Sequence, residues 1–377
     1  LAARCAALGL RPGDRIAYAG RNSPTLLLTA LAAAHLGAVL LPLNFRLAEG
    51  ETCDLLQRCG VSVVVVEEQM RELIDRARLG TSVTHVIDAA TAFLPDPSTP
   101  AVARLRCAPD ELALLMATSG SSGHPKIVRL SHGNLWWSAR NIDEAFDTRE
   151  DDVVLAVAPM FHIGGFNGFT WRTFLRGGTV LIRRTFDADR TLVDLTEGGV
   201  TALFGVPAMY AALTRSPAFA HADLAGVRSA ITGGAPLPSG LVERFAARGL
   251  TVRNSWGMTE TAPAATCLPA GDTLTHPGSV GLPLPHTQIR LVCPDTGEDV
   301  AEPGVVGELW VQGPNVMSGY WQDEVATAAA VTSDGWLRTG DLATRAADGY
   351  LTIVGRRSEL INTGGEKVYV EEVEGVL

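Results

Sequence analysis

The chain has 377 residues, of which 46% are hydrophobic and 19% are charged, and its formal net charge is −10. This length allows two or three domains with substantial cores, and the composition is that of a globular protein. The net negative charge argues against nucleic acid as the main partner, because such proteins usually carry a basic surface. The six cysteines contain no Cys-x-x-Cys pair and the eight histidines show no metal-ligand spacing. These features predict reduced thiols in a cytoplasmic protein, without a cysteine–histidine metal site.

The first part of the chain predicts alternating helices and strands. Residues 25–45 carry no formal charge, but they contain Gly37 and Pro42. They therefore favour an amphipathic helix followed by a buried strand over residues 38–43, and not a membrane span. Residues 61–66 are β-branched and apolar except for one serine, which is typical of a parallel strand. This alternation predicts a doubly wound α/β unit.

A loop rich in glycine and hydroxyl groups follows an apolar run at residues 112–116 and ends in Lys126. Its composition alone favours a flexible surface loop. Its glycines, however, also let backbone N–H groups turn toward an anion, and Lys126 adds a mobile positive charge. The spacing is not that of a Walker P-loop, because Gly-Lys-Ser/Thr is absent. After the loop, Ser131 can cap a helix that runs to about residue 146. The candidate phosphate-binding residues in this loop are Thr118, Ser119, Gly120, Ser121, Ser122, Gly123 and Lys126.

A second alternation of strands and helices occupies residues 153–255 and includes one helix expected over residues 164–175. From about residue 281, short β runs separated by glycine turns predict a small, distorted β-barrel. The predicted fold class is therefore α/β, with two doubly wound α/β subdomains and this barrel. The expected boundaries are residues 1–150, 151–280, 281–355 and 356–377.

Three further segments carry groups suited to chemistry. His162 ends a predicted strand and precedes two glycines that permit close ligand approach, although a lone histidine is more often structural. Residues 254–260 read Asn-Ser-Trp-Gly-Met-Thr-Glu and supply an amide, an aromatic face, a hydroxyl and a carboxylate. Asp341 follows a glycine and is either a surface turn residue or an acceptor for two neighbouring hydroxyl groups.

Taken in order, these motifs resemble those of the adenylate-forming superfamily, which includes acyl-CoA synthetases, peptide-synthetase adenylation domains and luciferases. The resemblance runs from Thr118-Ser-Gly-Ser-Ser-Gly-His-Pro-Lys126 to the Asn-Thr-Gly-Gly-Glu-Lys-Val-Tyr segment at residues 362–369. The Gly-Gly-Glu-Lys sequence within this segment most resembles that of acyl-CoA synthetases. Trp256 stands where tyrosine is commoner in the family, and Ser358 stands where the hinge residue is more often Asp or Lys.

The resemblance implies a role for each of these positions. Thr259 would contact the α-phosphate, Glu260 would hold Mg²⁺, and His162 would flank the substrate carboxylate; with Lys126 these are the expected catalytic residues. Ser358 would be the hinge. The adenine and ribose would lie on Gly233, Gly234, Ala235, Asn254, Ser255, Trp256, Gly257, Asp341 and Arg356. The acyl pocket would comprise His162, Ile163, Gly164, Gly165, Phe166, Val206, Gly233 and Met258, with its glycines leaving space for a bulky acid.

The implied activity is that of an AMP-forming acid–thiol ligase that uses ATP, Mg²⁺ and coenzyme A. The expected substrate is a monocarboxylic fatty, aromatic or polycyclic acid, because the predicted pocket contains no obvious buried Arg or Lys. Two alternatives remain open: an acyl-AMP ligase that loads a carrier protein, and a non-catalytic nucleotide-binding scaffold. The family's adenylation lysine belongs to a C-terminal lid that the sequence is expected to lack, so slow adenylate formation is expected.

Overall fold

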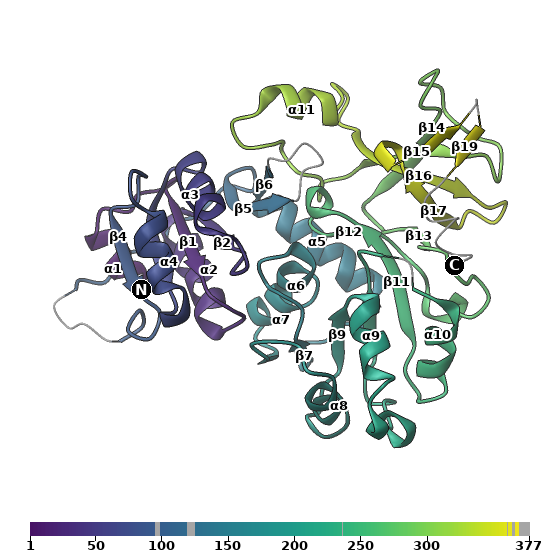
Figure 1. The fold of residues 1–377 in the computed structure, drawn as a ribbon, viewed down its shortest axis with the longest axis horizontal. Helices are drawn as coiled ribbons and strands as arrows, with labels where there is room; N and C mark the ends of the chain where they lie inside the picture. Colours follow the sequence, from purple (N-terminus) through teal and green to yellow (C-terminus); the bar gives the residue numbers. More distant parts are fainter. Residues whose placement is uncertain (95–98, 119–124, 236, 360, 364–365, 369–377) are drawn as a thin grey trace.

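The computed structural model describes residues 1–94, 99–118, 125–235, 237–359, 361–363 and 366–368. Three β-sheets follow one another along the chain (Figure 1). The first sheet and its helices form the purple and blue part of the ribbon, the second sheet forms the teal and green part, and the third forms the yellow-green part. A short hairpin near the end of the described chain consists of β18 (Ile361–Thr363) and β19 (Glu366–Val368).

The first sheet has the strand order β4-β3-β1-β2-β5-β6, in which every pair is parallel except β5 with β6. Its strands are β1 (Arg15–Ala19), β2 (Val39–Leu43), β3 (Val61–Val66), β4 (His85–Asp88), β5 (Leu112–Thr118) and β6 (Lys126–Ser131). The helices of this part are α1 (Ala2–Ala7), α2 (Pro24–Leu36), α3 (Glu49–Arg58) and α4 (Glu68–Ala77). The fully buried β2 confirms that the uncharged segment ends in a buried strand, and among the described residues no helix is long and apolar enough to cross a membrane.

The β5–β6 hairpin carries the predicted phosphate loop. Thr118 and Lys126 face each other as register partners at the loop end of this hairpin, so the two strands fix both ends of the loop. Ser119, Gly120, Ser121, Ser122 and Gly123 lie outside the described residues. Beyond β6, the backbone N–H of Asn134 donates to Ser131 Oγ at 3.1 Å. The predicted helix cap is thereby confirmed at the start of α5 (His132–Ala145).

The second sheet has the order β13-β12-β11-β10-β9-β7-β8, with β7 to β11 parallel and β12 and β13 antiparallel. Its strands are β7 (Val153–Ala156), β8 (Thr179–Ile182), β9 (Ala202–Gly205), β10 (Ser229–Thr232), β11 (Val252–Gly257), β12 (Ala264–Cys267) and β13 (Leu282–Pro283). The accompanying helices are α6 (Ile163–Asn167), α7 (Thr170–Leu175), α8 (Ala188–Glu197), α9 (Pro207–Leu213) and α10 (Ser239–Ala246). Three short 3₁₀ helices are η1 (Pro217–His221), η2 (Thr259–Thr261) and η3 (Ala270–Asp272).

The single helix expected over residues 164–175 is wrong, because the chain turns between α6 and α7. The turn brings Gly168 directly against the preceding helix: a Cβ on this residue would lie 2.5 Å from the carbonyl oxygen of Gly164. Only glycine tolerates such a close approach of backbone to backbone. Sequence periodicity gave no sign of this break, because both halves of the segment are apolar.

The third sheet is antiparallel throughout, in the order β14-β15-β16-β17. Its strands are β14 (Gln288–Val292), β15 (Gly307–Gln312), β16 (Leu337–Arg345) and β17 (Leu351–Arg356), with α11 (Glu324–Ala330) between β15 and β16 and η4 (Arg357–Glu359) after β17. The predicted α/β class with a C-terminal unit of short β runs is confirmed. One buried cluster joins Val63 of the first sheet, Trp256 of the second and Leu309 of the third, so the sheets share a core.

A buried polar network also links the first sheet to the second. Glu67, at the end of β3, receives hydrogen bonds from Tyr18 Oη at 2.9 Å and from the backbone N–H of Arg21 at 3.1 Å. Arg184, beyond β8, donates to both carboxylate oxygens of Glu67 at 2.9 and 2.7 Å. Burial alone would raise the pKa of Glu67, but the hydrogen bonds from Arg184, Arg21 and Tyr18 outweigh it and hold this pKa below its ordinary value.

We expect Glu67→Gln to lower the free energy of unfolding by about 1 to 3 kcal/mol at pH 7, because a charged acceptor of three donors is lost. A folded-state pKa below the unfolded one stabilises the protein above the unfolded value and ceases to do so as pH falls through the folded value. The difference between wild type and Glu67→Gln should therefore narrow below about pH 4.5. Urea unfolding of both proteins at several pH values measures this difference in the free energy of unfolding.

The matched control is Glu68→Gln, which changes the neighbouring, exposed carboxylate. Its free energy of unfolding should differ little from that of the wild type at every pH value tested. A difference between wild type and Glu67→Gln that stays constant down to pH 3 would contradict the account of the network.

Candidate functional site

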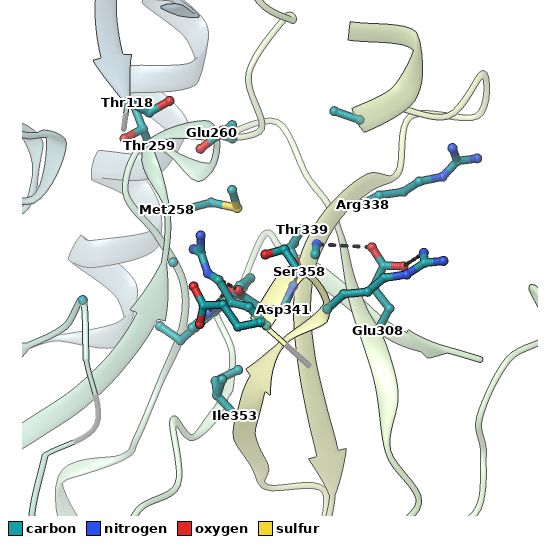
Figure 2. A pocket seen from close by; sticks show the side chains of 18 of the residues that line it. Thr118, Met258, Thr259, Glu260, Glu308, Arg338, Thr339, Asp341, Ile353 and Ser358 are labelled. Carbon is teal, nitrogen blue, oxygen red and sulfur yellow. Dashed lines mark hydrogen bonds and ion pairs between the residues drawn. The ribbon is translucent and has the colours of Figure 1, made fainter. Parts of the chain in front are cut away.

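A cavity of about 880 Å³ lies where the three sheets meet. Figure 2 shows Thr118, Thr259 and Glu260 at one end and Asp341 and Ser358 at the other. The cavity is lined by residues from all three parts of the chain, which sequence motifs alone did not place together. The predicted site residues that line it are Thr118, Lys126, Gly234, Ala235, Asn254, Ser255, Trp256, Gly257, Met258, Thr259, Glu260, Asp341, Arg356 and Ser358.

Glu260 lies in η2 at the phosphate-loop end of the cavity and is 5% exposed. Tyr320 Oη donates to Glu260 Oε1 at 2.8 Å. The Nζ of Lys126 lies 4.8 Å from the centroid of the Tyr320 ring, within the range of a cation–π contact. Burial raises the pKa of Glu260 above its ordinary value, although Tyr320 and the positive charge of Lys126 oppose this. The result is a carboxylate with one oxygen fixed and a cation nearby.

The donor set at Glu260 fits a magnesium ion that is held mainly by a substrate. Mg²⁺ prefers oxygen ligands and commonly binds one or two protein carboxylates together with phosphate oxygens. Among the described residues no group of three or more His, Cys, Asp or Glu side chains could hold a metal alone. Glu260 therefore suits an ion that arrives with a polyphosphate, and less a metal bound by protein side chains only.

Asp341 and Arg356 are cross-strand partners on β16 and β17 at the other end of the cavity. The Nε of Arg356 lies 2.8 Å from Asp341 Oδ1. The indole Nε1 of Trp256, on β11, donates to Asp341 Oδ2 at 2.9 Å. Burial raises the pKa of Asp341, while Arg356 and the Trp256 hydrogen bond counteract it. A buried carboxylate with two fixed partners is thus presented to the cavity.

Glu308 is a cavity residue that sequence reasoning missed. It lies on β15 and accepts the backbone N–H of Gly340 at 3.2 Å, while its other oxygen lies 3.4 Å from Arg357 Nη1 (Figure 2). Gly340 has φ +74°, the left-handed conformation that glycine adopts most easily. Glu308 therefore fixes the irregular part of β16 that presents Asp341. Glu308 lies in the region of short β runs, and this sequence context indicated only a structural role.

Tyr320 is a second cavity residue that the sequence analysis did not single out. Neither Tyr320 nor Glu308 lies close to its partner in sequence; Tyr320 and Glu260 are 60 positions apart. No local signal could have found these contacts. The other cavity residues outside the prediction are Gly278, Val280, Ala326, Ala329, Ala330, Arg338, Thr339, Gly340, Ile353, Arg357 and Glu359.

The side chains of β11 that line the cavity differ in their hydrogen bonding. Asn254 Nδ2 donates to the backbone carbonyl of Ser279 at 2.9 Å, and among the described residues its Oδ1 accepts no hydrogen bond. That oxygen is suited to accept an exocyclic amino group of a purine. Ser255 Oγ donates to the carbonyl of Thr266 at 2.7 Å, so its hydroxyl serves the β11–β12 pairing. Gly257 sits at an irregularity of this pairing.

The predicted acyl-pocket residues do not all line this cavity. Met258 does, whereas the remaining ones lie around α6 and the ends of β9 and β10: His162, Ile163, Gly164, Gly165, Phe166, Val206 and Gly233. His162 caps α6 without a side-chain hydrogen bond to that helix, and its ring centroid lies 4.3 Å from that of Phe161. Partial desolvation, with a smaller contribution from Arg46, lowers the pKa of His162.

The expectation that glycines keep an acyl pocket open is wrong for α6. A Cβ on Gly164 would lie 2.5 Å from Cζ of Phe204, and a Cβ on Gly165 would lie 2.3 Å from the carbonyl oxygen of Pro159. These glycines allow close packing of a ring and of backbone, so the space beside them is filled. The Phe204 ring also lies 3.9 Å from the position of a Cβ on Gly233. Phe204 therefore separates two of the predicted acyl-pocket glycines.

The family model of AMP-binding enzymes matches residues 1–321, and the chain belongs to this family. The adenylate-forming resemblance of its motifs is thereby confirmed. The assignments of individual residues to adenine, ribose, phosphate and acyl group stay predictions.

Two curated relatives are similar over nearly the whole chain. Feruloyl-CoA synthase of an Amycolatopsis species is 40% identical over 374 residues, which cover 98% of this chain and 74% of the relative. Indoleacetate–CoA ligase of Aromatoleum aromaticum is 38% identical, over 100% of this chain and 75% of the relative.

Solved structures agree in fold. ATP-bound MatB from Rhodopseudomonas palustris has a TM-score of 0.89 and 31% identity, covering 99% of this chain and 75% of that one. O-succinylbenzoate coenzyme A synthetase from Bacillus subtilis, in complex with ATP and magnesium ion, has a TM-score of 0.89 and 30% identity, covering 100% and 76%.

The environment of Gly257 yields a stability prediction. A Cβ on this residue would lie 1.9 Å from the backbone carbonyl oxygen of Pro263. We expect Gly257→Ala to lower the free energy of unfolding by about 1 to 3 kcal/mol or more, because backbone must move to relieve the overlap. Urea unfolding measures the change.

The control is Gly240→Ala in α10, where an added Cβ meets no atom within 4 Å. It should leave stability unchanged or raise it by up to about 1 kcal/mol, because alanine is the better helix former. Equal losses of unfolding free energy in the two variants would contradict the conclusion that the close approach of Pro263 requires glycine at position 257.

Proposed function

We propose that the cavity is the nucleotide site of an AMP-forming acid–thiol ligase that activates a monocarboxylic acid with ATP and transfers the acyl group to coenzyme A. The observation that carries this proposal is the polarity of a single cavity. One end holds Lys126 and the buried carboxylate of Glu260, and the other end holds Trp256 and the Asp341–Arg356 pair. The cation and the hard oxygen donor at one end suit the magnesium-bound phosphates of ATP, and the aromatic ring and the hydroxyl acceptor at the other end suit its adenosine.

In the first step, an oxygen of the substrate carboxylate attacks the α-phosphorus of ATP. The bond from this phosphorus to the bridging oxygen breaks, and pyrophosphate leaves with the electron pair, so an acyl-adenylate remains. The main obstacle is the approach of two anions, which positioning and charge neutralisation reduce. Lys126 would bind the phosphates, Thr259 would contact the α-phosphate, and a magnesium ion held by Glu260 would supply further positive charge.

In the second step, the thiol of coenzyme A loses its proton to solvent, its sulfur attacks the acyl carbonyl, and AMP leaves with the electron pair of the broken mixed-anhydride bond. Coenzyme A is the proposed acceptor because the similar curated relatives are CoA ligases by name. No covalent enzyme intermediate is required, so the site needs no nucleophile with an adjacent base.

Among the expected substrate classes, we propose an aromatic acid in preference to a fatty or polycyclic one. Two relatives, at 40% and 38% identity, carry the names of ferulate and indoleacetate ligases. The residues of the predicted acyl pocket agree with an apolar acid, because Ile163 and Phe166 are buried and the Phe204 ring packs against Gly164. Flat aromatic rings also pack well against such side chains.

The test is carboxylate-dependent exchange of labelled pyrophosphate into ATP, in which label accumulates even when turnover is slow. We expect exchange with aryl monocarboxylates and a loss of about 100-fold or more in Glu260→Gln, because a charge that supports the transition state is removed. The exposed carboxylate of Glu243 on α10 gives the control Glu243→Gln, which should retain full exchange. Absence of exchange with every acid, or full exchange in Glu260→Gln, would contradict the proposal.

A further inference from the structure

Trp256 makes a contact that its expected role on the adenine ring does not require. Its Nε1 donates to Asp341 Oδ2 at 2.9 Å, and both side chains line the cavity. The two residues belong to different sheets, β11 and β16, and are 85 positions apart. The expected adenine-binding and ribose-binding walls are therefore joined by one hydrogen bond between a neutral donor and a buried carboxylate.

The two oxygens of Asp341 are held in different ways. Oδ2 accepts the indole N–H, whereas Oδ1 faces Arg356 without receiving an aligned hydrogen bond from any residue that the structure describes. The Arg356 side chain is 52% exposed, and its Nε lies 2.8 Å from Oδ1. Trp256 is packed in the core shared by the three sheets. The Trp256 bond therefore limits rotation of the carboxylate, and Oδ1, which is covered and paired with Arg356, accepts from a ligand once Arg356 moves aside.

The part of β16 around Asp341 is held in place as well. The backbone N–H of Asp341 donates to Thr339 Oγ1 at 3.0 Å, and that hydroxyl donates to the carbonyl of Leu309 at 2.6 Å. With the main chain fixed, the remaining freedom of Asp341 is rotation of its carboxylate. Trp256 supplies the hydrogen bond that limits this rotation.

We propose that Trp256 is a positioning residue that orients Asp341, so that this carboxylate discriminates ribose from deoxyribose in the bound nucleotide. The inference rests on the proposed function, because it takes the ligand at Asp341 to be a ribose. A carboxylate has about four lone-pair sites in one plane, and a diol is bound well only when that plane matches its hydroxyl groups. Orientation before binding removes an entropic cost that the ligand would otherwise bear.

The experiment measures affinity for three probes in the presence of magnesium: ATP, 2′-deoxy-ATP and 3′-deoxy-ATP. In the wild-type chain, removal of a hydroxyl that Asp341 accepts should weaken binding by about tenfold. Trp256→Phe keeps an aromatic ring but removes the N–H donor. This variant should bind ATP more weakly. Its loss of affinity on removal of the hydroxyl, the binding penalty, should fall to about twofold or less, because a misoriented carboxylate no longer accepts a good hydrogen bond from that hydroxyl.

Two further variants separate the causes. Trp171 and Trp256 are both 8% exposed, but Trp171 lies outside the cavity; Trp171→Phe should therefore keep the wild-type penalty. Asp341→Asn should abolish the penalty. If Trp256→Phe weakens binding of all three nucleotides by the same factor, the positioning role is overturned, and Trp256 serves adenine or packing alone. If Asp341→Asn retains the full penalty, or wild type binds no ATP, the ribose placement of the proposed function fails.

A measurement on the unaltered chain covers the case in which Trp256→Phe does not fold. The chain has seven tryptophans, whose indole N–H groups give separate nuclear magnetic resonance signals. One of these signals should shift on addition of ATP and shift differently with the deoxynucleotide that shows the binding penalty. Identical indole spectra for ATP and both deoxynucleotides at saturation would overturn the proposal.

Discussion

Three buried carboxylates at the junction of the sheets, Glu260, Glu308 and Asp341, constrain the structure more than any other feature. A buried charge without partners is strongly destabilising, so each of these groups must meet a donor or cation when the chain folds. The partners come from distant segments: Tyr320 for Glu260, the backbone N–H of Gly340 for Glu308, and Trp256 for Asp341. Correct docking of the sheets and completion of the site are therefore one event.

The same constraint explains the chemical character of the cavity. Burial makes the charged forms of Glu260 and Asp341 less favourable, as the direction of both pKa shifts indicates. Lys126 and Arg356 offset this cost only in part. A ligand that brings a metal ion to Glu260 and hydroxyl groups to Asp341 would compensate both carboxylates. The ligand that the proposed function requires would thus stabilise the site.

Much of the fold could be predicted from the sequence, because its signals are local. The buried strand at residues 39–43, the Ser131 cap and the short strands from residue 288 onward follow from hydrophobic patterns and capping chemistry. The motifs also named many of the cavity residues. The contacts between them could not be predicted, since the Trp256–Asp341 and Tyr320–Glu260 bonds join segments 85 and 60 positions apart. The glycines of α6 were misread because their neighbour Phe204 comes from another strand.

The central claim is that the cavity between the three sheets binds an acyl-adenylate. Calorimetric titration with non-hydrolysable acyl-sulfamoyl adenosines tests it most directly, because these compounds combine the nucleotide and the acid in one stable molecule. Feruloyl, indoleacetyl and long-chain acyl versions would be compared. The account predicts one-to-one binding that is tightest for an aryl-acyl compound. Absence of binding by all of them, to a chain shown to be folded, would contradict it.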